Sequence, residues 1–307
     1  MTNYIRGDLL LYTNKGFKRL DKLSKLDLIY GTNNYNEIDN IVKHNLKGYP
    51  YLFKIKTLHN IDNYYLSGNN KIYCIQNIPY DLKMKDCSNF IEDNKRICSP
   101  SFISVNELTD FDYIGYPIIN DNDNDNDNDK YRFQGLILLD QFMFSLNNNI
   151  NINTIGFLNK YLHNNNIQFE LFNNNITTSI KIDIIDKKKI LKKEEILNLS
   201  AQNIRKIIKG FIEINSVVNT NDKTVFYFLK NLFMKIGILL NANYINNNYV
   251  IKIPQSLEET EKNYFTYDNY IWSKIKKIGK TDKYFGHLYS IKMTNNNKYL
   301  TEVGVIS

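Results

Sequence analysis

The first 116 residues carry short apolar runs separated by polar turns, a pattern that is typical of β-strands. Four segments rich in β-branched and aromatic residues are predicted to be strands: 9–12, 51–56, 63–66 and 71–75. The sequence Thr-Asn-Lys-Gly at residues 13–16 supplies a turn after the first of them. This part of the chain is therefore predicted to be all-β.

A strict alternation of Asp and Asn follows at residues 121–129. Such a segment has no apolar side chain to bury and repels itself, so we interpret residues 117–130 as an acidic, solvated linker. A calcium-binding loop is the alternative, and it needs Gly at its sixth position and Glu at its twelfth. Asn126 and Arg132 stand there instead, which excludes it.

The apolar pattern changes after the linker and then repeats. Helices are predicted at 133–144 and 154–162 and strands at 167–171 and 180–184; further helices follow at 204–214 and 224–237 and a further strand at 249–253. Residues 157–162 align visibly with residues 228–233. An internal repeat of about 70 residues is therefore expected. Beyond Pro254 the chain is polar and ends in two more predicted strands, 288–293 and 298–306.

Composition narrows the class of protein. The chain has no run of 18 apolar residues and no signal-peptide core near its start, so neither a membrane span nor export is predicted. Cys74, Cys87 and Cys98 form no Cys-x-x-Cys pair, and the four histidines lie far apart, which argues against a zinc site. We expect an intracellular protein of a reducing compartment, the cytoplasm or the nucleus. The net charge of +7 is compatible with a polyanionic partner.

Short motifs in a fixed order point to a family. They lie at residues 7–16 with 20–23, at 66–73, and at 288–291 with 299–301 and 304–306. Between them, Gly-Leu-Ile-Leu-Leu-Asp at 135–140 and Gly-Phe-Ile-Glu-Ile-Asn at 210–215 belong to the two predicted repeats. In order and spacing these motifs resemble an intein, a Hint splicing module split in sequence by a dodecapeptide (LAGLIDADG-type) homing endonuclease.

The resemblance implies an α+β fold. The all-β Hint-like module would comprise residues 1–116 and 259–307. It would be interrupted by the linker at 117–130 and by a pseudo-twofold LAGLIDADG-type domain of two αββαββα repeats at 131–258. Internal pseudo-symmetry of this kind implies a monomer.

The resemblance also indicates where splicing residues should stand. The first nucleophile, a Cys or Ser, falls at Tyr4, and the histidine that polarises the neighbouring amide falls at Asn70. The closing histidine falls at Asn297, and the chain ends at Ser307 without His-Asn. A phenol is a poor candidate for the acyl shift, and an amide exchanges no proton near neutral pH. Splicing is therefore predicted to be lost.

The nuclease positions are altered as well. By the resemblance, the last acid of each dodecapeptide helix holds a divalent metal. Asp140 keeps this position as a candidate catalytic and metal-binding residue, with a helix-end cap as the alternative, whereas Asn215 is a neutral amide. Leu139 and Ile214 replace the small residues that usually precede the acids, which predicts that the two helices are forced apart. Glu213 could substitute as a ligand, but a solvated carboxylate is the preferred interpretation.

Lysines favour contact with DNA. Residues 181–209 carry nine Lys or Arg against four Asp or Glu, and the candidate contacts are Lys181, Lys187, Lys188, Lys189, Lys192 and Lys193. Lys252 lies on the strand that corresponds to that of Lys181. A second cluster is formed by Lys274, Lys276, Lys277, Lys280 and Lys283. For each of the two clusters a solvated linker or helix face is the alternative. The nearby aromatic residues at 264–272 are expected in a core rather than as stacking platforms.

The preferred function is a degenerate intein-like or homing-endonuclease-like protein that binds double-stranded DNA, with splicing lost and cleavage lost or crippled. An active, nicking, Mg²⁺-dependent endonuclease resting on Asp140 is the first alternative. A domesticated structural or assembly protein that uses the scaffold alone is the second. No cofactor is expected, apart from Mg²⁺ if nuclease activity survives, and no small-molecule substrate is evident.

Overall fold

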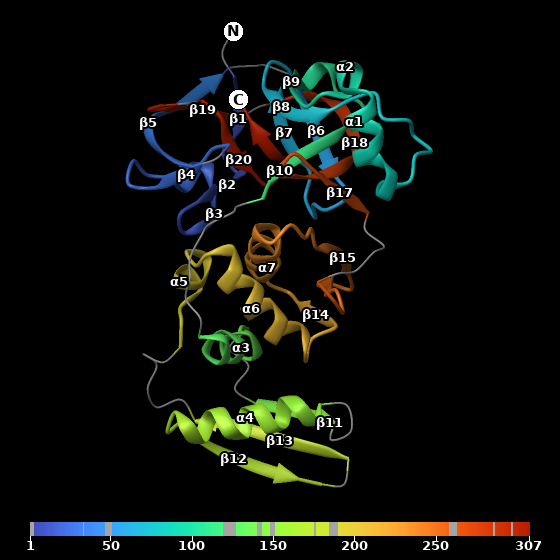
Figure 1. Cartoon of the computed structure of the whole chain (residues 1–307). Coiled ribbons are helices and arrows are strands. Elements are labelled where there is room, and N and C mark those ends of the chain that lie inside the picture. The colour runs from blue at the N-terminus through green and yellow to red at the C-terminus, as the bar shows by residue number, and fades with distance from the viewer. Residues whose placement is uncertain are drawn as a thin grey trace. The chain divides into compact units, whose positions relative to one another are not determined.

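The computed structural model describes residues 3–307, apart from 33, 47–50, 119–126, 140–142, 148–150, 175, 184–189, 258–262, 285 and 296. Contacts divide the chain into two compact units (Figure 1). The larger unit comprises Met1–Ile119, Asn219–Ile251 and Thr260–Ser307, and the smaller unit comprises Asn120–Val218 and Lys252–Glu259. No helix of the described residues is long and apolar enough to span a membrane.

The larger unit is dominated by one antiparallel sheet. Its strands from the first part of the chain are β1 (Ile5–Arg6), β2 (Leu10–Thr13), β3 (Gly16–Arg19), β4 (Leu28–Tyr30), β5 (Tyr35–Leu46), β6 (Tyr51–Thr57), β7 (Tyr64–Ser67), β8 (Lys71–Ile75), β9 (Ser101–Ser104) and β10 (Tyr113–Pro117). Those from the last part are β17 (Tyr264–Tyr267), β18 (Tyr270–Lys283), β19 (Gly286–Met293), β20 (Tyr299–Thr301) and β21 (Gly304–Ile306). The strands predicted at 9–12, 51–56, 63–66, 71–75 and 288–293 are present, whereas the single strand predicted at 298–306 is a hairpin of β20 and β21.

Strands from the two ends of the sequence are interleaved in this sheet. The order is β10-β18-β6-β7-β1-β19-β5-β4-β2-β20-β21-β8-β9, with β3 on β2 and β17 on β18. Strand β10 also pairs with β8, so the path closes on itself. The short helices α1 (Cys87–Asp93) and α2 (Lys95–Cys98) and the 3₁₀ turns η1 (Leu20–Lys22), η2 (Met84–Asp86) and η3 (Val105–Glu107) fill the connections.

One hydrophobic cluster in the core of this unit contains Trp272. Its indole is fully buried and packs with Phe265, Tyr113 and the side chains of Cys87 and Cys98. The expectation that the aromatic residues at 264–272 lie in a core is thus confirmed for Trp272 and Phe265. Cys74, Cys87 and Cys98 are all buried free thiols.

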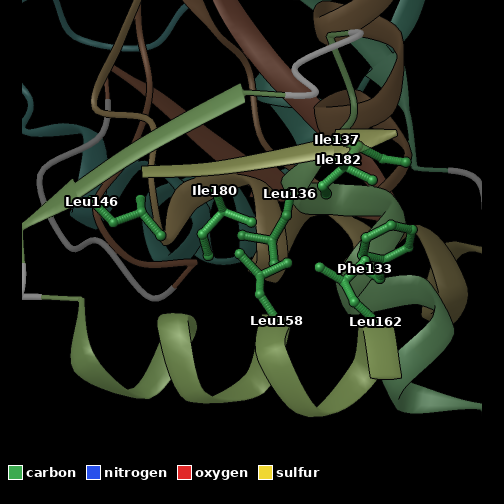
Figure 2. Packing of buried hydrophobic residues seen from close by; sticks show 8 residues of the cluster. All are labelled: Phe133, Leu136, Ile137, Leu146, Leu158, Leu162, Ile180 and Ile182. Atoms are coloured by element: carbon green, nitrogen blue, oxygen red, sulfur yellow. The ribbon is translucent and has the colours of Figure 1, made fainter. Parts of the chain in front are cut away.

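The smaller unit contains α3 (Asn128–Leu136), β11 (Met143–Asn147), α4 (Ile152–Asn164), β12 (Gln168–Asn173), β13 (Thr177–Asp183), α5 (Lys193–Leu197) and α6 (Ala201–Ile212). The carboxylate of Asp127 caps the first turn of α3, accepting from the Lys130 amide at 3.0 Å. Helix α4 turns Leu158 and Leu162, four residues apart, toward the alternate residues Ile180 and Ile182 of β13 (Figure 2). These contacts make the core of the unit.

The predicted helix at 133–144 is wrong over its second half. Helix α3 ends at Leu136, residues 137–139 form a turn, and β11 begins at Met143. The segment is apolar almost throughout, and such a run has no periodicity that separates a buried helix from a buried strand.

The remaining elements repeat the order of the smaller unit. After α6 come β14 (Val217–Thr220), α7 (Lys223–Lys235), β15 (Asn241–Ile245) and β16 (Asn248–Lys252). Helix, strand, helix and a two-stranded hairpin thus occur twice, and the corresponding sheets have the matching orders β11-β13-β12 and β14-β16-β15. Between the two helices of each series the described residues hold one strand, whereas the αββαββα order that the resemblance implies has two.

Candidate functional site

The backbone of Tyr4 is held by the segment that follows β7. The Tyr4 amide donates to Ser67 Oγ at 3.0 Å, and the Tyr4 oxygen accepts from the Ser67 amide at 3.0 Å. Asn70 Nδ2 donates to the same Tyr4 oxygen at 2.9 Å. Ser67 and Asn70 are both buried. The sequence therefore folds the predicted nucleophile position against the two polar residues of the internal motif.

Asn70 holds this arrangement together without being able to titrate. Its Nδ2 also donates to Ser67 Oγ at 2.8 Å, while its Oδ1 is buried with no hydrogen-bond partner among the described residues. An amide can fix the position of a carbonyl through such donors, but it moves no proton near neutral pH. Asn70 therefore positions the Tyr4 main chain and supplies no acid–base group.

The last residue of the chain lies beside the same segment. Ser307 and Lys71 exchange two main-chain hydrogen bonds, at 2.9 and 3.1 Å, and Asn3 Nδ2 reaches the Ser307 oxygen at 3.4 Å. Tyr4, Asn70 and Ser307, three of the positions indicated by the sequence, therefore come together. We call these residues, with Ser67, the terminal site.

Asn297 lies elsewhere. It is exposed in the turn after β19, and its Oδ1 accepts from the Met293 amide at 3.1 Å. This contact closes the turn, which is an ordinary role for Asn.

His44 lies beside the terminal site and was not indicated by the sequence. Its ring meets the ring of Tyr4 edge-on, with centroids 5.1 Å apart, and its Nε2 lies 2.8 Å from Ser290 Oγ. His44 lies on β5, a strand whose polar sequence gave no periodic signal. An imidazole is thus available beside Tyr4, but it faces the phenol ring rather than the amide nitrogen that Ser67 holds.

Helices α3 and α6 approach closely through two glycines. A Cβ added to Gly135 would lie 2.0 Å from the main-chain oxygen of Ile207, and one added to Gly210 would lie 2.3 Å from that of Arg132. The contact is reciprocal, because each glycine meets the residue three positions before the other. The expectation that large residues force these helices apart is therefore wrong: Leu139 follows the end of α3, and Ile214 follows the end of α6 and packs against the core.

The predicted metal positions have different fates. Asn215 is buried, and its Nδ2 donates at 2.9 Å to the main-chain oxygen of Phe211 at the end of α6. Its side chain thus caps the helix. Asp140 lies outside the described residues. Within the described ranges, no group of three or more His, Cys, Asp or Glu is arranged to hold a metal ion.

Glu213 is occupied by a structural ion pair. Both of its carboxylate oxygens accept from Arg132, each at 2.8 Å, and Oε2 also accepts from Thr154 Oγ1 at 2.9 Å. The Arg132 guanidinium lies 4.1 Å from the centre of the Phe157 ring. A carboxylate with three donors has its lone pairs directed at protein groups, so Glu213 is poorly placed to replace a metal ligand.

The structure describes some of the lysines that were predicted to contact DNA. Lys181 lies on the exposed face of β13 and pairs with Glu170 at 3.2 Å, and Lys252 is exposed at the end of β16. Lys192 and Lys193 are exposed where α5 begins. Lys187, Lys188 and Lys189 lie outside the described residues.

Among the solved structures that match this chain is a homing endonuclease. A solved structure described as mesophilic variants of the homing endonuclease I-DmoI matches with a TM-score of 0.32 and 12% identity. The match covers 41% of this chain and 88% of that one. No family model and no curated protein matches the sequence.

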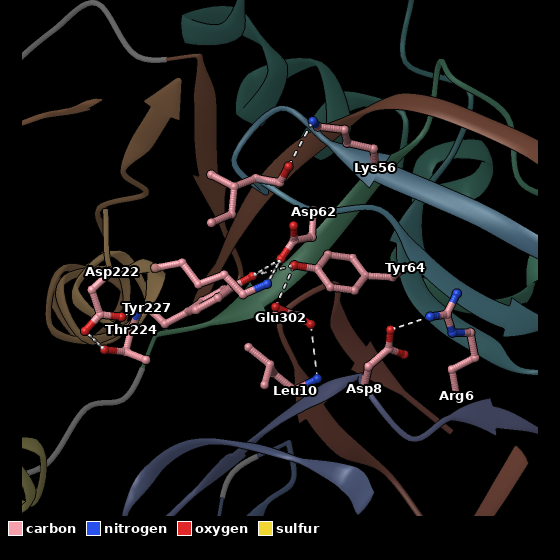
Figure 3. Close-up of polar contacts among 12 residues, drawn as sticks. Arg6, Asp8, Leu10, Lys56, Asp62, Tyr64, Asp222, Thr224, Tyr227 and Glu302 are labelled. Atoms are coloured by element: carbon pink, nitrogen blue, oxygen red, sulfur yellow. Dashed lines mark hydrogen bonds and ion pairs between the residues drawn. The ribbon is translucent and has the colours of Figure 1, made fainter. Parts of the chain in front are cut away.

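A series of hydrogen bonds between polar side chains, which we call the polar chain, connects α7 to the sheet in the larger unit (Figure 3). Glu302 accepts from Tyr64 Oη and from the Leu10 amide, the Tyr64 and Tyr227 hydroxyls lie 3.1 Å apart, and Tyr227 donates to Asp62 at 3.0 Å. Burial raises the pKa of Glu302 to about 8.

Lys230 lies next to this chain. It is fully buried, donates to Asn60 Oδ1 and to the Glu302 main-chain oxygen, and has its pKa lowered by burial to about 8. The sequence indicated none of these residues, because they come from segments far apart along the chain: residues 60–64, helix α7 and Glu302.

Proposed function

We propose that this protein is a DNA-binding relative of inteins and homing endonucleases that has lost splicing and lost or nearly lost cleavage. The observation that carries the proposal is the reciprocal crossing of α3 and α6 at Gly135 and Gly210. Each contact maps onto the other by a shift of 75 residues, since 210 minus 135 and 207 minus 132 give the same number.

A crossing of this kind supports an internal repeat of two related half-domains. The same shift relates α3 to α6, and the strand orders β11-β13-β12 and β14-β16-β15 correspond element by element. Two related sheets in one chain suit a ligand that is itself nearly twofold symmetric, as duplex DNA is. In β13 the residues that alternate with the buried Ile180 and Ile182 include Lys181, which is exposed and could meet phosphate.

The contacts of Asn215 and Glu213 support the loss of cleavage. The first side chain is directed back at its own helix, and the second is bound to Arg132. The paired mechanism of these enzymes needs a carboxylate ligand from each helix, and a neutral amide binds Mg²⁺ far less well. We therefore propose that the second metal position is inactive.

The terminal site supports the loss of splicing in a similar way. Ser67 and Asn70 hold the main chain of Tyr4 by hydrogen bonds, and a scissile segment would need to be held in this way. The nucleophile position holds a phenol and the amide-polarising position holds an amide, while the His44 ring faces the phenol ring, so neither a strong nucleophile nor an acid–base group is directed at the amide bond before Tyr4. We propose that the terminal site stabilises the fold and no longer catalyses splicing.

Salt-dependent binding to duplex DNA tests this function. Fluorescence anisotropy with a labelled duplex of about 30 base pairs should show affinity that falls steeply with salt, with a log–log slope of about −5 for six phosphates. The variant Lys181→Gln with Lys252→Gln, and separately the neutralisation of Lys187, Lys188 and Lys189, should flatten that slope.

Two results would contradict the proposal. Absence of binding at low salt would leave only the use of the fold as a scaffold for other proteins. Conversion of supercoiled plasmid to nicked circles in Mg²⁺ or Mn²⁺, abolished by Asp140→Asn, would assign the protein to the active nucleases instead.

A further inference from the structure

Two lysines of the larger unit face each other across a pair of strands. Lys56 on β6 and Lys277 on β18 are direct partners in the antiparallel register. Like charges placed opposite each other in this way destabilise a sheet. The register shifts between Ile275 and Lys277, so Lys276 is an additional residue in β18, and it is also exposed.

The same face continues across two more strands. Lys54 lies opposite Gly279 of β18 and Tyr65 of β7, and residues directly opposite each other in a sheet point to one side. Tyr65 carries the guanidinium of Arg6, from β1, 4.3 Å above its ring. A Cβ on Gly279 would meet nothing within 4 Å, so the space in front of Lys54 is open on that side.

We call Lys54, Lys56, Lys276, Lys277 and Arg6 the basic row. Among the residues that the structure describes, none of its four lysines forms an ion pair, whereas Arg6 is paired with Asp8 at 2.6 Å. The nearby Asp62 is engaged by Lys223 at 2.5 Å and by Tyr227 (Figure 3). The row therefore presents positive charge that the protein itself leaves largely uncompensated.

Lys56 experiences this charge directly. Burial lowers the pKa of its ammonium, the neighbouring Lys276 and Lys54 lower the pKa further, and Asp62 opposes them. Among the described residues, its Nζ donates to one acceptor, the Ile61 main-chain oxygen, at 3.1 Å. A side chain in this position gains from an external anion more than a solvated lysine does, because the anion relieves repulsion that is already present.

We propose that the basic row binds the phosphate backbone of duplex nucleic acid, as a surface of the larger unit that is separate from the two three-stranded sheets. The row crosses β18, β6, β7 and β1, a width of about 14 Å at about 4.8 Å per strand. That width matches about four phosphates along one strand of a duplex, at 3.4 Å of helix axis each. The ring of Tyr65 is covered by Arg6, so the row offers phosphate contacts rather than a stacking platform for single strands.

A matched pair of triple variants of the full chain tests this surface. Lys54→Gln, Lys56→Gln and Lys277→Gln should lower affinity for a 30-base-pair duplex at least about tenfold near 100 mM salt and reduce the salt slope by about 2.7, or 0.9 per contact. The control triple Lys22→Gln, Lys83→Gln and Lys85→Gln removes the same charge at other exposed positions and should change affinity less than about twofold.

A stability measurement guards against misfolding of the variant. Because repulsion is removed, Lys56→Gln and Lys277→Gln should each leave the midpoint of urea unfolding unchanged or raised. A lowered midpoint would show that these lysines serve the fold, and would contradict the proposal. Equal weakening of DNA binding by both triples would reduce the effect to net charge and would also overturn it.

The outcome is separable from that of the proposed function. Weakening by Lys181→Gln with Lys252→Gln, but not by the basic-row triple, would overturn the surface proposed here and leave the function intact. The opposite pattern would retain this surface and remove the sheets from the interface. If the protein bound polyglutamate of similar charge as tightly as the duplex, and the basic-row triple weakened both equally, the assignment to nucleic acid would be overturned.

Discussion

The side-chain amide of Asn215 donates a 2.9 Å hydrogen bond to the main-chain oxygen of Phe211, one turn earlier. A carboxylate at this place would lose the donor and set a negative charge against the carbonyl end of α6. We therefore expect Asn215→Asp to lower the free energy of unfolding by about 1–2 kcal/mol at pH 7. Urea titration measures this, and the deficit should shrink below pH 4, where Asp is protonated. An equally stable variant that cuts plasmid would contradict this interpretation.

The glycine crossing gives a second prediction. Gly135→Ala or Gly210→Ala would bring a methyl group within 2.3 Å of a main-chain oxygen that cannot move independently of its helix. Each should destabilise the protein by about 1–3 kcal/mol, although alanine favours helix. Gly156→Ala in α4 is the control, because a Cβ there meets nothing within 4 Å, and it should be neutral or stabilising by up to about 1 kcal/mol. If all three variants behaved alike, the close crossing would be disproved.

Glu302 should make stability depend on pH. Its pKa in the folded protein is about 8, against about 4.3 in an unfolded chain. Between these values the folded state keeps a proton that the unfolded state releases, so the free energy of unfolding falls as pH rises, by at most about 1.4 kcal/mol per pH unit. The Glu302→Gln side chain does not titrate. The free energy of unfolding of this variant, relative to that of the unchanged protein, should therefore rise steadily from pH 5 to pH 8.

Lys230 acts with the opposite sign at higher pH. Its lowered pKa of about 8 means that the folded state releases a proton before the unfolded state does, so stability should recover above pH 8. Urea titrations at intervals of one pH unit would locate the minimum. A flat difference between Glu302→Gln and the unchanged protein from pH 5 to pH 8 would show that Glu302 is ionised when buried.

Splicing gives a fourth prediction. Residues 4–307 placed between two reporter domains, with Ser added after Ser307, should remain an intact fusion on a denaturing gel. Tyr4→Cys alone should not change this, because Asn70 still offers no proton. Tyr4→Cys combined with Asn70→His restores a nucleophile and a titratable group at positions that already contact each other, and should allow thiol-induced cleavage before residue 4. Spliced product from the unchanged sequence would overturn the interpretation of the terminal site.

The sequence predicted what depends on local pattern. Strands β2, β6, β7 and β8 and helices α4, α6 and α7 were predicted from the apolar pattern, and Trp272 was expected in a core. Strands β5 and β18 were missed, because partly exposed strands rich in Asn and Lys carry no apolar alternation.

The details of the site depended on contacts between distant elements. Gly135 and Gly210 could be read as motif residues, but only their approach to Ile207 and Arg132 shows that they, and not Leu139 and Ile214, set the helix spacing. His44 and Glu302 reach their partners across more than 200 positions of sequence, as the pairs with Ser290 and Tyr64 show. No local pattern encodes such pairs.

The buried cysteines have a practical consequence. Cys74, Cys87 and Cys98 are the only thiols in the sequence, and all three belong to the larger unit. Burial raises the pKa of each, to about 11 for Cys87, so the folded protein should react slowly with alkylating reagents. The rate of alkylation then measures how often the larger unit opens, without any signal from the smaller one. Alkylation rates measured with and without nucleic acid would therefore show whether binding changes how often the larger unit opens.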